Sequence, residues 1–154
     1  MGPQKYKFIL KDKKEVARET FAFYFERPEG FEFRVGQNMR LFFPELDEFN
    51  QKRTFTIASA PHEDDLMCVT RMRGSQFKNK LASLSFGESV EAEAPTGEKF
   101  LLHEDSSISA VFLAGGVGVA PFRSMLAHIA HNDLKHTAWL FYSNKHEEDI
   151  SFFE

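Results

Sequence analysis

The sequence predicts a β + α/β fold, in which a small antiparallel six-stranded β-barrel precedes the first β–α–β unit of a parallel-sheet domain. The barrel is indicated by several short alternating segments separated by turn residues within the first hundred residues. The β–α–β unit is indicated by a continuous apolar run at 110–114, which is typical of a buried parallel strand. A glycine-rich turn joins this run to a helical pattern and to a second apolar run at 137–142. We therefore expect one domain at 1–103 and a second, partial domain at 104–154.

Six segments account for the predicted barrel. The first, at 6–11, alternates aromatic or aliphatic residues with lysines, and the second, at 17–27, places three phenylalanines on one face. Further strands are predicted at 34–43, 53–59, 66–73 and 90–94, and a Pro-Thr-Gly turn ends the last of them. The eighteen phenylalanines suit a β-rich core and could also form aromatic walls around a flat ligand.

Composition argues against several classes of protein. The net charge of -4 and the pI near 5.9 do not favour binding to nucleic acid or to an anionic membrane. No apolar run approaches the roughly 20 residues of a membrane span, and the N-terminus lacks a signal-peptide pattern, so we expect a cytoplasmic protein. The single cysteine, Cys68, is expected in the core. The six histidines show no metal-ligand spacing, and we expect His128 and His131 on a helix surface.

The segment from Arg53 to Ser59 carries the residues best suited to bind a ligand. A period of two puts Arg53, Phe55 and Ile57 on one face of a strand, and Thr54, Thr56 and Ala58 on the other. A flavin dinucleotide needs a bidentate cation at its pyrophosphate, an aromatic neighbour and a small hydrogen-bond donor near N5. By itself the segment also fits an ordinary half-buried strand with an arginine at its mouth.

A short helix at 76–84 is predicted to form an anion site at its start. Ser75 is a suitable N-cap, and Phe77, Leu81 and Leu84 share the apolar face. The free main-chain N–H groups of residues 75–78 would point outward. Positive charge beside them would come from Arg71, Arg73 and Lys78. The alternative is a solvated basic face with a routine cap.

The turn between the apolar run and the next helix contains Gly115, Gly116 and Gly118, and ends at Pro121. Glycines without Cβ atoms, exposed N–H groups and a helix N-terminus together suit the pyrophosphate of a nucleotide. Pro121 fits the first turn of a helix whose apolar residues follow at helical spacing. The alternative is a tight strand-to-helix turn of any α/β domain.

The order of these motifs resembles the ferredoxin–NADP reductase family from about Tyr6 onward. The family's flavin motif, Arg-x-(Tyr/Phe)-(Ser/Thr)-x-x-Ser, is matched by Arg53, Phe55, Thr56 and Ser59. The family's Gly-Gly-x-Gly-x-x-Pro turn is matched at 115–121. Many members have Ser or Thr at the position of Lys78, and members often have Thr at the position of Ala120.

The resemblance implies FAD as cofactor and NAD(P)H as substrate. Arg53 would clamp the FAD pyrophosphate, Phe55 would line the ribityl chain and flavin, and Thr56 would be the catalytic residue that donates to N5. The full set of implied cofactor-binding residues is Arg53, Thr54, Phe55, Thr56, Thr70, Arg71, Ser75, Gln76, Phe77, Lys78, Gly115, Gly116, Gly118, Val119, Ala120 and Pro121.

The implied activity is transfer of hydride from NAD(P)H to FAD, with electrons leaving to a small carrier such as ferredoxin, flavodoxin or an iron–sulfur protein. The sequence stops soon after the second apolar run, and 149–154 reads as the start of a helix. We therefore expect the N-terminal part of a longer reductase, or one half of a split one. Two alternatives are a non-catalytic flavin-binding electron-relay subunit and a β-barrel interaction module without cofactor.

Overall fold

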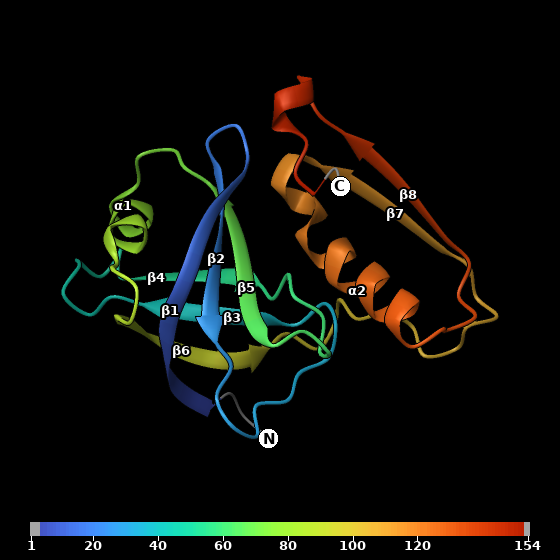
Figure 1. Cartoon of the computed structure of the whole chain (residues 1–154), viewed down its shortest axis with the longest axis horizontal. Coiled ribbons are helices and arrows are strands. Elements are labelled where there is room, and N and C mark those ends of the chain that lie inside the picture. Colours follow the sequence, from blue (N-terminus) through green and yellow to red (C-terminus); the bar gives the residue numbers. More distant parts are fainter. Residues whose placement is uncertain (1–3, 153–154) are drawn as a thin grey trace.

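The structure, a computed structural model, describes residues 4–152 and consists of a β-barrel beside a smaller α/β unit (Figure 1). All pairs in the barrel are antiparallel, in the order β4-β3-β6-β1-β2-β5. The two outer strands approach each other, because the Ala58 N–H just after β4 donates to the Met67 carbonyl of β5 at 2.7 Å. The predicted six-stranded antiparallel barrel is therefore confirmed. Its strands are β1 (Gln4–Ala17), β2 (Thr20–Glu26), β3 (Asn38–Phe42), β4 (Lys52–Thr56), β5 (Asp65–Arg71) and β6 (Ser89–Thr96).

Phenylalanine rings fill the barrel core. Phe8, Phe23 and Phe25 are wholly buried, and Cys68 is buried among them as expected. The barrel is covered by helix α1 (Gln76–Ser83), which inserts Phe77 and Leu81 into this core. Its predicted N-cap is confirmed, since the Ser75 side chain accepts a hydrogen bond from the Lys78 main-chain N–H.

The predicted third strand began too early. Residues 34–37 form a turn, in which Gly36 has a φ of 93° and the Gln37 side chain accepts a hydrogen bond from the Arg34 N–H at 2.8 Å. Strand β3 starts only at Asn38. In contrast, β1 is longer than predicted, because its first half pairs with β6 and its second half with β2.

The second unit is a parallel β–α–β arrangement, and α2 lies between its two strands and the barrel (Figure 1). Phe122 and Met125 of α2 pack on Phe112 and Ala114 of β7. The unit comprises β7 (Ala110–Gly115), the 3-10 turn η1 (Gly116–Val119), α2 (Ala120–His131), β8 (Ala138–Ser143) and the 3-10 turn η2 (Glu147–Asp149).

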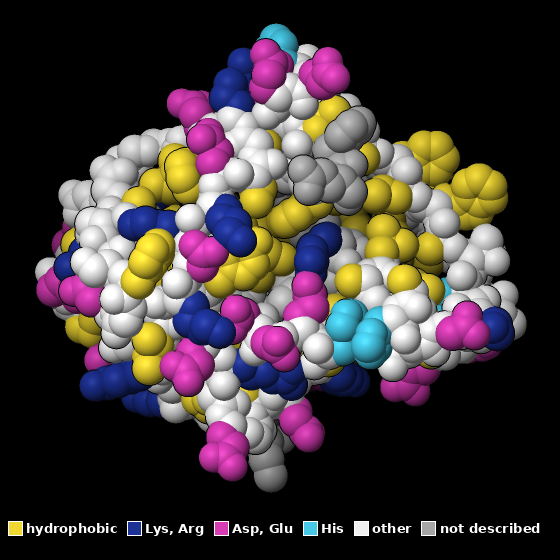
Figure 2. Space-filling model, viewed as in Figure 1, with side chains coloured by type: hydrophobic (Ala, Val, Ile, Leu, Met, Phe, Trp, Pro, Cys, Tyr) yellow, Lys and Arg dark blue, Asp and Glu magenta, His cyan; other side chains and the backbone are white. Residues whose placement is uncertain are grey.

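Two expectations for this unit were wrong. Strand β7 is not buried on both faces: the side chains of Val111 and Leu113 are 60% and 73% exposed, because α2 covers only the opposite face. Figure 2 shows hydrophobic side chains gathered over this side of the molecule. Residues 149–152 do not start an α-helix, since Ile150 is extended and Phe152 has a φ of 59°. The last two residues of that predicted helix lie outside the described residues. No helix in the described part of the chain is long and apolar enough to cross a membrane.

Candidate functional site

Three cations surround the start of α1. The Arg53 guanidinium lies 5.8 Å from the centre of the Phe77 ring, and its Nη1 donates to the carbonyls of Phe49 (3.0 Å) and Lys52 (2.6 Å). The pKa of Lys78 is lowered, first by burial and then by the charges of Arg73 and Arg53. Within residues 4–152, none of these three cations forms an ion pair with a carboxylate. The cluster Arg53–Arg73–Lys78 therefore carries uncompensated positive charge beside a helix N-terminus, which fits the pyrophosphate of FAD.

Strand β4 alternates as predicted. Arg53 and Phe55 face α1, and the Phe55 and Phe77 ring centres are 6.0 Å apart. On the other face, the Thr54 hydroxyl accepts a hydrogen bond from Arg40. The Thr56 hydroxyl donates to the Asn38 side-chain oxygen at 3.1 Å. Sequence reasoning missed Asn38, although it is the register partner of Thr56 across β3 and β4.

The remaining residues predicted around the pyrophosphate differ in their solvent exposure and in their partners. Phe77 is fully buried, main chain included, so it supports the site only through the contact of its ring with the Arg53 guanidinium. Gln76, in contrast, is exposed on the first turn of α1. Thr70 is 5% exposed on β5. The Arg71 guanidinium lies near two carboxylates, those of Glu19 (3.6 Å) and Asp149 (3.5 Å). The main-chain carbonyl of Arg71 accepts a hydrogen bond from the Lys78 ammonium.

The glycine turn leaves open space in front of it. A Cβ atom added at Gly115, Gly116 or Gly118 would meet no atom within 4 Å. Val119 and Ala120 are buried, and Ala120 packs on Ala58, Met67 and Val69 of the barrel. Pro121 lies in the first turn of α2. The turn is therefore fixed against the segment that directly follows β4, and its exposed surface can receive a dinucleotide backbone.

Polar contacts that the sequence did not reveal hold the two units together. Arg123 of α2 forms a two-bond ion pair with Glu63, and the Nη2–Oε1 distance is 2.7 Å. The Ser124 hydroxyl donates to the Ser59 carbonyl at 2.7 Å, while the Ser59 hydroxyl accepts from the Met67 N–H. His131, expected on the surface, stacks on His62 with ring centres 3.8 Å apart. Among the residues described, no group of three potential metal ligands is found.

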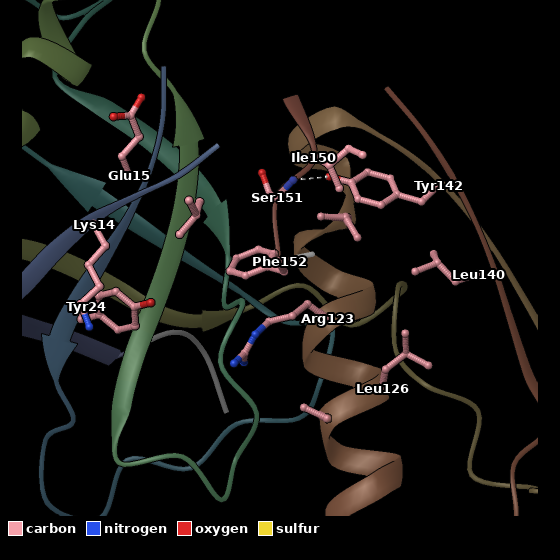
Figure 3. Close-up of a pocket in the computed structure, with 13 residues that line it drawn as sticks. Lys14, Glu15, Tyr24, Arg123, Leu126, Leu140, Tyr142, Ile150, Ser151 and Phe152 are labelled. Carbon is pink, nitrogen blue, oxygen red and sulfur yellow. Dashed lines mark hydrogen bonds between the residues drawn. The ribbon is translucent and has the colours of Figure 1, made fainter. Parts of the chain in front are cut away.

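A cavity of about 750 Å³ lies between the barrel and α2 (Figure 3). Phe152 enters it from the C-terminal segment, and the Arg123 guanidinium lies 5.6 Å from the centre of the Phe152 ring. Of the predicted cofactor-binding residues, only Val119 lines this cavity. It therefore does not coincide with the surface formed by β4, α1 and the glycine turn.

Two family models match the chain consecutively. An FAD-binding domain matches residues 6–115, and an oxidoreductase NAD-binding domain matches residues 112–154. The chain belongs to the ferredoxin–NADP reductase family. The family models thus indicate FAD as the cofactor and the beginning of an NAD-binding domain at the C-terminal end of the chain.

Known proteins resemble the chain over most of its length. It is 34% identical to ferredoxin--NADP reductase B of Sorangium cellulosum, over 83% of this chain and 53% of that protein. It is 30% identical to the reductase component of propane 2-monooxygenase from Gordonia sp., over 80% of this chain and 35% of that protein. The chain thus spans about half or less of the length of these two relatives.

Solved structures share the fold. The cytochrome P450 reductase GcoB of Amycolatopsis aligns with a TM-score of 0.83 at 22% identity, over 98% of this chain and 46% of that one. Ferredoxin-NADP+ reductase of Plasmodium falciparum aligns with a TM-score of 0.81 at 18% identity, over 98% of this chain and 62% of that one.

Proposed function

We propose that the chain forms the FAD-binding part, and the beginning of the NAD(P)-binding part, of a flavin-dependent oxidoreductase that passes electrons to a small carrier. The carrier would be a ferredoxin, a flavodoxin or an iron–sulfur protein. The observation that supports this most directly is the cluster Arg53–Arg73–Lys78, which has no carboxylate partner in the described chain and adjoins the N-terminus of α1. We place the domain boundary at 103/104, in the linker that precedes β7.

The phosphate site would combine charge with main-chain donors. Arg53 is held in place by the carbonyls of Phe49 and Lys52 and by the Phe77 ring, so little side-chain freedom remains to be lost when an anion binds. Not all the N–H groups expected to be free at 75–78 are available, since that of Lys78 donates to the Ser75 cap and Phe77 is fully buried. The exposed Gln76 would donate its main-chain N–H to the pyrophosphate oxygens. The Lys78 ammonium is oriented by the Arg71 carbonyl and would contribute charge.

Thr56 would act on the flavin ring. When bound, FAD accepts two electrons from the nicotinamide and can release them singly, so the protein's part is binding, orientation and electrostatics. Asn38 holds the Thr56 hydroxyl at the end of β4 by accepting its hydrogen bond. Because a hydroxyl has only one proton, Thr56 would turn this proton from the Asn38 oxygen to flavin N5 when FAD binds. Phe55, on the other face of the same strand, would support the ribityl side.

The glycine turn would receive NAD(P)H. Its open surface and the N-terminus of α2 suit a second pyrophosphate, and Ala120 packs this turn against the residues after β4. The Arg123–Glu63 ion pair would keep the two nucleotide sites at a fixed separation. Such positioning can supply as much as roughly 7–11 kcal/mol of a reaction barrier.

The visible spectrum of the purified chain, followed by mass identification of the released flavin, tests the proposal. We expect a yellow protein that releases FAD. A colourless protein that does not take up added FAD would contradict the proposal and favour the cofactor-free interaction module. Bound FAD that NAD(P)H never reduces, even in the longest natural form of the protein, would favour the electron-relay subunit.

A further inference from the structure

Phe49 is displayed on the surface of the loop between β3 and β4. Its side chain is 87% exposed, more than any other large hydrophobic side chain in the described chain. Exposing a phenylalanine to this extent gives up the stabilisation that its burial would bring, and nothing in the barrel core requires a ring at this position. The ring is therefore available to an external partner.

The loop that carries Phe49 is well defined by hydrogen bonds. The Asp47 carboxylate accepts from the main-chain N–H groups of Phe49 (3.1 Å) and Asn50 (3.2 Å), and also from the Asn50 side chain. The Asn50 side chain is the main reason why the pKa of Asp47 is lowered. The Asp47 carbonyl accepts from the N–H groups of Asn50 and Gln51, both at 2.9 Å. The turn thus presents the ring in a preformed arrangement.

The same loop is joined to the proposed pyrophosphate site. The Phe49 carbonyl accepts a hydrogen bond from Arg53 Nη1 at 3.0 Å, so the residue that presents the ring also orients the cation. Of the three acidic residues in the loop, Glu45 forms an ion pair with Lys80 at 3.1 Å, which compensates its charge close to the expected anion. Asp47 is engaged by N–H donors of its own turn, and Glu48 is exposed to solvent, which screens its charge.

We propose that Phe49 is the stacking surface for the adenine ring of FAD. This inference rests on the proposed function, because it requires the FAD pyrophosphate at Arg53. In FAD, only a ribose separates the pyrophosphate from a flat aromatic base, and Phe49 adjoins the cation that would hold the pyrophosphate. Aromatic rings bind bases by stacking without needing hydrogen bonds to the base edge. FMN has no adenine, so Phe49 contributes to the preference for FAD over FMN.

The experiment titrates apo-protein, prepared by removing the flavin from the purified chain, with FAD and separately with FMN. Affinities are measured by quenching of flavin fluorescence. Phe49→Ala should weaken FAD binding by roughly 5- to 150-fold, the range that follows from loss of one stacked base. FMN binding should be unchanged. Phe49→Trp should retain FAD affinity, whereas Phe49→Leu, which is apolar but not aromatic, should lose most of it.

Phe86→Ala is the matched control, since Phe86 is also a highly exposed phenylalanine, at 62%. It follows the C-terminal end of α1, where the Lys13 ammonium lies over its ring. It should leave both affinities unchanged. Wild-type FAD affinity in Phe49→Ala would overturn the inference, and so would an equal loss of FAD and FMN binding, which indicates a distorted loop. A wild-type chain that binds neither flavin would overturn the proposed function itself.

Discussion

Arg123 and Glu63 join α2 to the loop between β4 and β5 through two hydrogen bonds. Arg123 Nη1 also donates to the Ala58 carbonyl at 3.1 Å, and the Ala60 N–H donates to Glu63. Burial opposes ionisation of the Glu63 carboxyl, but the hydrogen bonds from Arg123 and Ala60 outweigh it, so that its pKa lies below the ordinary value.

The ion pair should make stability depend on pH. Because the pKa of Glu63 is lower in the folded state, its contribution is present above the unfolded pKa and is lost as pH falls through the folded pKa. Glu63→Gln should cost about 1–2 kcal/mol of unfolding free energy at pH 7. Urea unfolding of both proteins at pH 7 and pH 3 measures this. An equal cost at the two pH values would rule out an ionic contribution.

Gly36 should resist substitution for a steric reason. A Cβ at this position would lie 2.0 Å from the Phe100 carbonyl oxygen and 2.8 Å from Met125 Cε, whereas one at Gly30 would meet nothing within 4 Å. Both glycines have positive φ, of 93° and 70°. Gly36→Ala should therefore destabilise the fold by at least about 2 kcal/mol more than Gly30→Ala, as expected for overpacking. Thermal unfolding of the two variants measures the difference. Equal losses of stability in Gly36→Ala and Gly30→Ala would show that only the backbone conformation matters.

Arg53→Ala should weaken FAD binding by roughly 2–4 kcal/mol, because one charge-assisted partner of the pyrophosphate is removed. Arg40→Ala is the control, since Arg40 lies on the neighbouring strand and contacts Thr54 and Glu93 instead. Both variants should remain folded by circular dichroism. Equal flavin affinity in the two variants would exclude a clamp at Arg53.

Thr56→Val should retain bound FAD but change its electronic properties. The substitution keeps the shape of the side chain and removes the hydroxyl, which bonds to Asn38 in this structure and is the proposed donor to N5 when FAD is bound. Loss of a hydrogen bond worth about 1 kcal/mol corresponds to roughly 20 mV in a two-electron midpoint potential, toward more negative values. Spectroelectrochemical titration measures the shift. A midpoint potential identical to that of the wild type would mean that Thr56 has no role at the flavin beyond its place in β4.

Gly118→Ala should separate binding from stability. An added Cβ meets no atom within 4 Å, so the unfolding free energy should change by less than about 0.5 kcal/mol. The methyl group would nevertheless occupy the surface proposed for the dinucleotide, and NAD(P)H affinity should fall by at least about tenfold. Denaturant unfolding and a nucleotide titration are compared on the same preparation. A large stability loss, or undiminished nucleotide binding, would contradict this assignment.

The sequence by itself determined those features that depend only on residues close together in the chain. The two faces of β4 follow from the period of a strand, and the cap at Ser75 follows from a side chain and an N–H three residues apart. The six strands and the order of the two units could be predicted because alternation, turn residues and apolar runs are encoded within short segments. The positive charge beside the start of α1 was predictable for the same reason, since Arg73 and Lys78 lie within three residues of Ser75. That an anion binds there stays a prediction.

The tertiary structure decided the rest, because it joins groups that no local pattern relates. Arg123 meets Glu63 across 60 positions of sequence, and Arg18 meets Asp149 across 131. Arg71 was predicted near the phosphate, but its guanidinium lies beside Asp149. The apolar run of β7 could not reveal which face α2 would cover, since apolar side chains point alternately to both faces of a strand. Long-range pairing and packing are set by how the elements meet, and hydrophobic periodicity carries no information about distant partners.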